Sequence, residues 1–157
     1  MRFRVTVIEN TPLTPIKDLD HVLSEFLQSI EYLPRGYKPR TAAMTLKESV
    51  PYRLFKECLL LRASRGWTID ELTTTLGTSR VTVYRHIRKL MALGLLERGK
   101  RSITSDNGSV ELTTYRFKQG DLLKAWMSAE ENINNALRNY RMTVEHIQGL
   151  VKKKVDR

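Results

Sequence analysis

The sequence predicts a mainly α-helical fold with one small β-hairpin and a long C-terminal helix. Three observations predict it. Apolar residues recur at helical spacing along most of the 157 residues. Two alternating segments flank a turn that contains Asn107-Gly108. Residues 121–152 lack proline and repeat apolar residues in steps of three and four. We therefore expect three parts, which are residues 1–48, 49–118 and 119–157.

Within the middle part, residues 49–65 predict a helix with a buried face. Ser49 can cap it, and Pro51 lies in its first turn, where a missing N–H costs little. Trp67 is placed to pack the next segment onto this helix. The expected apolar face consists of Leu54, Phe55, Cys58, Leu59 and Leu61.

Residues 68–93 predict two further helices joined by a tight turn. Thr68 can cap the first helix, and Glu71, three residues later, can close a capping box. Gly77 provides the left-handed residue that ends this helix. Thr78 or Ser79 can cap the second helix, which we expect at about 79–93. Its apolar face holds Val83, Ile87 and Leu90. Two helices with such a turn form a helix-turn-helix.

The opposite face of the second helix carries cations and no acid. Val81, Arg85 and Arg88 are predicted to point outward, with Thr82 and Lys89 on the flank. Guanidinium, hydroxyl and methyl groups of this kind contact base edges in the major groove and bind phosphates. The alternative is an ordinary solvated helix face, which usually also carries Glu or Asp.

A basic hairpin is predicted directly after this helix. Residues 95–104 and 110–117 alternate like strands, and residues 105–109 between them have turn composition, with Asn-Gly at the centre. From residue 78 to residue 118 the chain holds nine Lys and Arg against three Asp and Glu, within a formal net charge of +10 for the whole chain. This concentration of positive charge suits a polyanionic partner.

Together these segments resemble winged helix-turn-helix transcriptional regulators, the broad class that holds ArsR-, MarR- and PadR-type repressors. The resemblance covers about residues 50–118 and is carried by Glu71-Leu72, Leu76-Gly77, Ser79, Thr82-Val83, Arg85-His86-Ile87, Leu90 and Leu93-Gly94-Leu95-Leu96. It implies a winged helix-turn-helix DNA-binding domain at 49–118, with a recognition helix in the major groove and a wing on the backbone or minor groove. The expected DNA-binding residues are Ser79, Arg80, Val81, Thr82, Tyr84, Arg85, Arg88, Lys89, Arg98, Lys100 and Arg101.

Residues 119–157 predict a long, coiled-coil-like dimerisation helix with a basic tail. About 30 helical residues would span about 45 Å, which is too long to bury against so small a domain. The alternative is a helix that folds back on its own domain. Asn132, Asn135 and Asn139 either fix the register of a pair or are solvated. The expected dimerisation residues are Leu122, Trp126, Ile133, Leu137, Tyr140, Val144, Ile147 and Val151.

Residues 1–48 predict a strand-helix extension followed by a basic linker. Residues 1–8 alternate like a strand, with Phe3, Val5 and Val7 on one face. Residues 18–30 carry a helical apolar stripe of Leu19, Val22, Leu23, Phe26, Leu27 and Ile30, which suits core or subunit packing. Residues 31–48, with Tyr32 and Tyr37 among prolines and cations, form either a connector or an arm along a phosphate backbone. Thr41–Leu46 could add a short strand to the wing.

The composition argues against several kinds of site. The single cysteine, Cys58, allows no internal disulfide and no cysteine metal cluster, and we expect it to be a small buried side chain. His21, His86 and His146 lack the spacing of metal ligands. We find no glycine-rich phosphate loop and no defensible Ser-His-Asp order, so we expect no enzyme, no metal and no cofactor. No apolar run is long enough to span a membrane, and we expect a cytoplasmic, nucleoid-associated protein.

The leading hypothesis is a homodimeric, sequence-specific regulator of transcription that binds double-stranded DNA at an inverted repeat. The second hypothesis is a plasmid or virus replication or partition protein that binds repeated origin sites. The third is a winged-helix protein-interaction module, which would contact a protein partner through the apolar stripe of the N-terminal extension.

Overall fold

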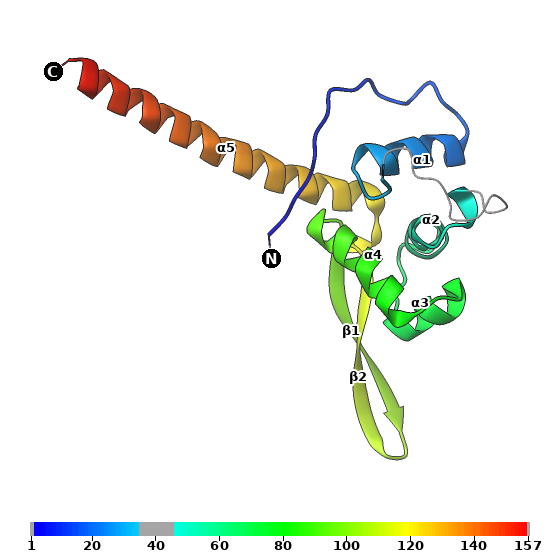
Figure 1. Ribbon diagram of the computed structural model, residues 1–157. Helices are drawn as coiled ribbons and strands as arrows, with labels where there is room; N and C mark the ends of the chain where they lie inside the picture. Colours follow the sequence, from blue (N-terminus) through cyan, green and yellow to red (C-terminus); the bar gives the residue numbers. More distant parts are fainter. Residues whose placement is uncertain (1, 35–45, 157) are drawn as a thin grey trace.

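The computed structural model describes residues 2–34 and 46–156, and it has the predicted fold class (Figure 1). Mostly helical elements precede a two-stranded antiparallel hairpin, and a long helix follows it, which is the architecture of a winged helix. The helices are α1 (Leu19–Ser29), α2 (Val50–Arg53), α3 (Ile69–Leu76), α4 (Arg80–Ala92) and α5 (Leu122–Val155). The hairpin consists of β1 (Leu96–Ser105) and β2 (Gly108–Phe117). Helix α2 continues as a π-helix, η2 (Leu54–Leu60), and 3-10 turns occupy η1 (Leu46–Glu48) and η3 (Lys118–Gly120).

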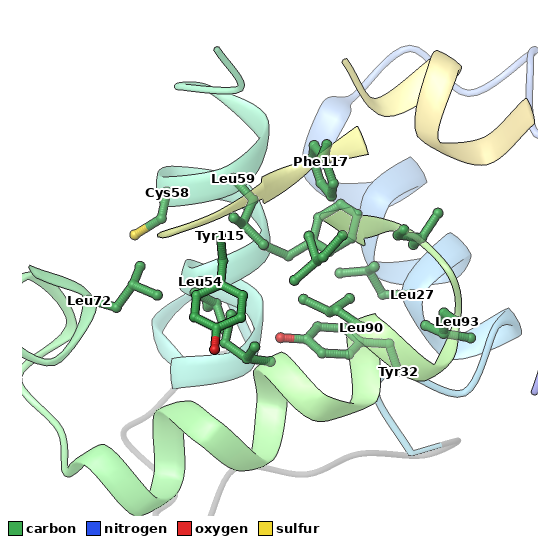
Figure 2. Close-up of a cluster of buried hydrophobic side chains, with 14 of the residues drawn as sticks. Leu27, Tyr32, Leu54, Cys58, Leu59, Leu72, Leu90, Leu93, Tyr115 and Phe117 are labelled. Carbon is green, nitrogen blue, oxygen red and sulfur yellow. The ribbon is translucent and has the colours of Figure 1, made fainter. Parts of the chain in front are cut away.

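The core lies where α1, the α2–η2 helix, α3, α4 and the base of the hairpin meet (Figure 2). Each element contributes fully buried side chains, including Leu27, Leu54, Leu72, Leu90 and Phe117. The rings of Phe55 and Phe117 meet edge-to-face with centroids 5.2 Å apart. One residue of the apolar face predicted for the helix at 49–65 does not lie in the core. Leu61 is 62% exposed, because η2 ends at Leu60 and the chain turns there.

The π-helix connects the core helices to the wing through Trp67. The N–H of Leu61 donates to the carbonyl of Lys56 at 2.9 Å, five residues back, as the π-helical pattern requires. The carbonyl of Cys58 accepts from the indole N–H of Trp67 at 3.0 Å. The backbone of Trp67 in turn exchanges two hydrogen bonds of 2.8 Å with Tyr115 of β2. The predicted packing role of Trp67 is therefore confirmed.

One prediction for the N-terminal extension is wrong. Residues 2–8 form no strand. Their one backbone bond to another described segment runs from the Arg4 N–H to the Ala92 carbonyl, 2.8 Å, so the alternating pattern has no neighbouring strand to pair with. Of the two alternatives for residues 31–48, Tyr32 does not support the arm, since it is buried and its hydroxyl donates to the Pro51 carbonyl at 2.8 Å. Residues 35–45, the larger part of that segment, and nearly all of the expected strand Thr41–Leu46 lie outside the described residues.

Helix α1 matches its prediction closely. Asp18 caps it by accepting from the His21 N–H at 2.9 Å, and Leu23 and Leu27 are buried in the core. Phe26 is half-buried and meets Trp126 of α5 edge-to-face at 5.7 Å between centroids. Leu19, at the start of the stripe, is exposed. The stripe thus packs within the chain along most of its length.

Helix α5 packs on the body only through its first turns and then projects away from it (Figure 1). Its 34 residues span about 50 Å at 1.5 Å per residue. Ala125 and Ala129 are buried, and two predicted dimerisation residues, Leu122 and Trp126, pack against the chain's own core. Further along, Ile133 is half-buried, whereas the remaining predicted dimerisation residues are exposed. These are Leu137, Tyr140, Val144, Ile147 and Val151.

Candidate nucleic-acid interface

The helix-turn-helix forms from local capping chemistry. The Thr68 hydroxyl accepts from the Glu71 N–H at 3.1 Å, and the Glu71 carboxylate accepts from the Thr68 N–H at 2.9 Å. Gly77 ends α3 with φ +63°, a left-handed conformation that a side chain would strain. Ser79 then caps α4 by accepting from the Thr82 N–H at 3.2 Å. Each of these features was predicted from the sequence.

Helix α4 presents the predicted face to solvent. Val83, Ile87 and Leu90 are buried, and this fixes the rotation of the helix. The outward-facing residues predicted to bind DNA are exposed or half-buried. They are Ser79, Arg80, Val81, Thr82, Tyr84, Arg85, Arg88 and Lys89.

His86 lies on the buried side of this helix, under the candidate interface. Its ring is 6.2 Å from that of Tyr32, edge-to-face, and its Nδ1 has no hydrogen-bond partner among the described residues. Burial lowers the pKa of His86 to about 4, and the nearby charges of Arg85 and Lys89 act in the same direction. His86 is therefore neutral at pH 7. Its spacing of three after Val83 and four before Leu90 is the sequence signal for this burial.

The strands of the hairpin pair over ten residues, with Leu96 opposite Phe117 and Ser105 opposite Gly108. The two residues between the strands are Asp106 and Asn107, so the predicted Asn-Gly centre is displaced by one residue. Gly108 opens β2 with φ +109°.

Alternation along the strands divides the wing into two faces. The α3 face carries Glu97, Gly99, Arg101, Thr114 and Arg116, and the α4 face carries Arg98, Lys100, Thr113 and Tyr115. The two faces therefore present their cations to different parts of the chain.

Arg101, which the sequence predicts to contact DNA, makes hydrogen bonds within the protein. Its Nη1 donates to the Glu71 carboxylate at 2.7 Å, and its Nη2 donates to the Gly66 carbonyl. Arg65 donates to the same carboxylate. Partial burial raises the pKa of Glu71, but the hydrogen bonds from Thr68, Arg101 and Arg65 outweigh it and lower the pKa to about 2. Glu71 therefore both caps α3 and ties the wing to it.

Two more cations of this region pair with carboxylates. Arg80 is ion-paired with Asp70 of α3, so an acid does lie beside the outward face of α4. Asp70 and Arg80 are both exposed, and such a surface pair contributes little stability. On the α3 face of the wing, Arg116 donates to Glu97 at 2.8 Å.

The remaining cations between residues 78 and 118 have no carboxylate partner among the described residues. Three of the nine are ion-paired, as described above. The other six make no ion pair with any residue in 2–34 or 46–156. They are Arg85, Arg88, Lys89, Arg98, Lys100 and Lys118.

The described parts of the chain give little support for a metal site, a reactive cysteine or a membrane-spanning helix. No group of three or more His, Cys, Asp and Glu side chains within them could hold a metal ion. Cys58 is buried, as predicted, and burial raises its pKa to about 11. Among the helices described, none is long and apolar enough to cross a membrane.

Comparison with known proteins identifies the helix-turn-helix region. A family model described as an HTH domain matches residues 53–109, from the end of α2 to the start of β2. No curated protein matches the chain. Among solved structures, the chain is similar to a possible transcriptional regulator from Methanosarcina mazei Go1, with 19% sequence identity and a TM-score of 0.33. That similarity covers 62% of this chain and 79% of the other. The chain thus contains a helix-turn-helix domain, and the narrower ArsR, MarR or PadR resemblance remains a prediction.

Proposed function

We propose that the chain is a homodimeric regulator of transcription that binds double-stranded DNA in a sequence-specific manner. The observation that carries the proposal is the exposed face of α4. Arg85, Arg88 and Lys89 stand there without a carboxylate partner among the described residues, next to Arg98 and Lys100 of the wing. The match to an HTH domain over these same elements supports it.

In this proposal α4 lies in the major groove. Arg85, exposed at the centre of the outward face, is assigned to a base edge, where a guanidinium pairs best with guanine. Val81 and Thr82 suit thymine methyl groups, and Ser79 suits a phosphate. Arg80 can join them only by leaving Asp70, and the exposure of both side chains makes that exchange inexpensive. A protein of this kind would act in the cytoplasm, on the nucleoid.

The dimer is assigned to the part of α5 beyond the body. Five apolar side chains are exposed there in steps of three and four, from Leu137 to Val151. A long isolated helix with such a stripe gains stability by pairing with a second one. Two recognition helices in a symmetric dimer would reach half-sites about 34 Å apart, or a multiple of that distance. The expected binding site is therefore an inverted repeat.

Selection of bound sequences from a random duplex pool tests the function directly. We expect a two-fold symmetric motif. Arg85→Ala should weaken binding to it by about 1–3 kcal/mol and relax the preference at one base pair per half-site. Enrichment of tandem repeats without symmetry would favour an origin-binding protein instead. Recovery of no motif, together with salt-independent behaviour on duplex DNA, would refute the proposal.

Sedimentation of point variants tests the dimer. Ile147→Glu, on the stripe, should shift the protein from dimer to monomer at micromolar concentration. Met142→Glu is the matched control, because Met142 is equally apolar and exposed but lies off the stripe. A wild-type protein that sediments as a monomer would exclude this part of the proposal.

A further inference from the structure

A crevice of about 240 Å³ separates α4 from the base of the wing. Tyr84, Arg88 and Met91 line it from α4, and Arg98 and Tyr115 line it from the α4 face of the wing. The other two lining residues, Ile87 and Ala92, are apolar. The crevice is thus bordered by two arginines, and no acid is among its lining residues.

Neither arginine has an anionic partner in the part of the chain that the structure describes. Both are exposed, and neither makes an ion pair or a hydrogen bond with any residue of the described segments. This distinguishes them from Arg80, Arg101 and Arg116, which all engage carboxylates nearby. Two guanidinium groups on one opening repel each other, and an anion bound between them would remove that repulsion.

Both arginines are attached to well-fixed elements. Arg98 lies opposite Tyr115, whose backbone is bonded twice to Trp67 at 2.8 Å. The same strand is held on its other face by Arg101 and Glu71. The guanidinium of Arg88 lies 5.9 Å from the centroid of the Tyr84 ring, within the range of a cation–π contact. Binding an anion between them would therefore require little ordering of the backbone.

We propose that Arg88 and Arg98 hold one backbone phosphate of the bound duplex between them in this crevice. The planar guanidinium has a fork of donors that matches phosphate oxygens, and two forks can share the oxygens of one phosphate. Because Arg88 belongs to α4 and Arg98 to β1, this single phosphate would join the recognition helix and the wing. The inference rests on the proposed function, and it assigns Arg88 to the backbone rather than to a base.

Salt dependence and sequence preference test the assignment. Arg88→Ala and Arg98→Ala should each weaken binding to the selected duplex and binding to a random duplex by the same factor. Each should also reduce the slope of log affinity against log salt by about 1. Because the two side chains share a phosphate, the double variant should lose less than the product of the two single losses. Lys124→Ala is the matched control, since it removes an exposed cation at the start of α5, outside the crevice.

Chemical replacement of single phosphates locates the contact. Duplexes carrying one neutral methylphosphonate at successive positions should show one position per half-site where wild-type binding falls. In Arg88→Ala and Arg98→Ala, replacement of that same phosphate should no longer reduce binding. In Lys124→Ala, the replacement should still reduce it. Inorganic phosphate alone serves as a second probe, and we expect no binding of it at millimolar concentration.

Several outcomes would overturn the inference and leave the proposed function intact. One is a changed base preference in Arg88→Ala but not in Arg98→Ala. Another is insensitivity of the two variants at different phosphates. A third is binding of inorganic phosphate by the wild type that both substitutions abolish, because the crevice would then be a site for a small anion. Loss of all salt-dependent duplex binding in the wild type would instead refute the proposed function itself.

Discussion

The two faces of the wing use the same residue type in different ways. On the α3 face, Arg101 and Arg116 are held by Glu71 and Glu97 within the protein. On the α4 face, Arg98 lines an opening and has no carboxylate partner among the described residues. Arg98 and Arg101 are only three residues apart, and strand alternation alone sends them to opposite faces.

The difference shows that net charge overstates what a basic segment offers to a partner. The carboxylates that pair with wing cations, Glu71 and Glu97, lie on the α3 side, where the N-terminus of α3 also needs a capping acid. Glu71 meets both needs at once. The cations on the α4 face make no ion pair among the described residues, because α4 contributes no acid to that side and Glu111 of β2 pairs with none of them.

The largest expected effect on stability comes from Glu71→Gln. The amide can still accept from the Thr68 N–H, but it loses the charge-assisted bonds from Arg101 and Arg65. We expect the free energy of unfolding to fall by about 2–3 kcal/mol, as measured by urea denaturation. Glu111→Gln, an exposed acid on the α4 face, is the control and should change it by less than about 0.5 kcal/mol. Equal changes in the free energy of unfolding for the two variants would contradict the difference between the two faces.

Gly99→Ala should have the next largest effect. A Cβ at Gly99 would lie 2.9 Å from the Thr114 hydroxyl oxygen, and that side chain is buried against Gly66 on its other side. We expect a loss of about 1–2 kcal/mol from overpacking, again by urea denaturation. Thr114→Ala tests the mechanism, because it removes the hydroxyl that the new Cβ would meet; Gly99→Ala should then cost less in a Thr114→Ala background than in the wild type. Unchanged stability in Gly99→Ala would show that Thr114 can move away from an added methyl group, and hence that the α3 face is not tightly packed there.

The stabilisation by Glu71 should also depend on pH. Its pKa is lowered from 4.5 to about 2, so the folded state favours the charged carboxylate. The resulting stabilisation is present above pH 4.5 and is lost as the pH falls toward 2. The difference in unfolding free energy between the wild type and Glu71→Gln should therefore shrink from pH 5 to pH 2. A difference that stays constant over that interval would mean that Glu71 does not act through its charge.

The smallest effect on stability is expected for Lys100→Ala on the α4 face. Within residues 2–34 and 46–156, the one hydrogen bond of its ammonium goes to the Thr113 hydroxyl at 3.3 Å, on the exposed part of the wing. We expect the free energy of unfolding from urea denaturation to remain within about 0.5 kcal/mol of the wild type, while the salt slope of duplex binding falls by about 1. Arg101→Met should do the reverse, with a loss of stability and an unchanged slope. A Lys100→Ala variant as unstable as Arg101→Met would contradict the comparison.

The parts of the site that the sequence predicted are those that depend on short-range patterns. Thr68 pairs with Glu71, and Ser79 with Thr82, so each cap joins two residues that are three positions apart. The left-handed conformation of Gly77 depends on that residue alone. The burial of Val83, and hence the outward face of α4, follows from helical spacing. These patterns are reliable because the unpaired backbone N–H and C=O groups at the ends of a helix need hydrogen-bond partners, and nearby side chains supply them.

The parts that the sequence did not reveal depend on distant contacts. Arg101 and Glu71 are 30 residues apart, and their pairing requires the wing to fold back toward α3. The hydroxyl of Tyr32 meets a carbonyl 19 residues away, so its burial could not be inferred from the prolines and cations around it. The alternation of residues 1–8 indicated a strand, but a strand also needs a partner edge, and no local pattern specifies one.

The contacts of Phe3 and Arg4 have a practical consequence for work on this protein. Phe3 lies against Gly94 and 5.2 Å from the Lys118 ammonium, and Arg4 is bonded to the last turn of α4. An affinity tag or fluorophore attached next to Phe3 would sit beside α4 and could alter the binding that it is meant to report. The opposite end of the chain lies at the distal tip of α5 (Figure 1), so labels for the α4 and wing experiments belong there, and the sedimentation experiments call for untagged protein.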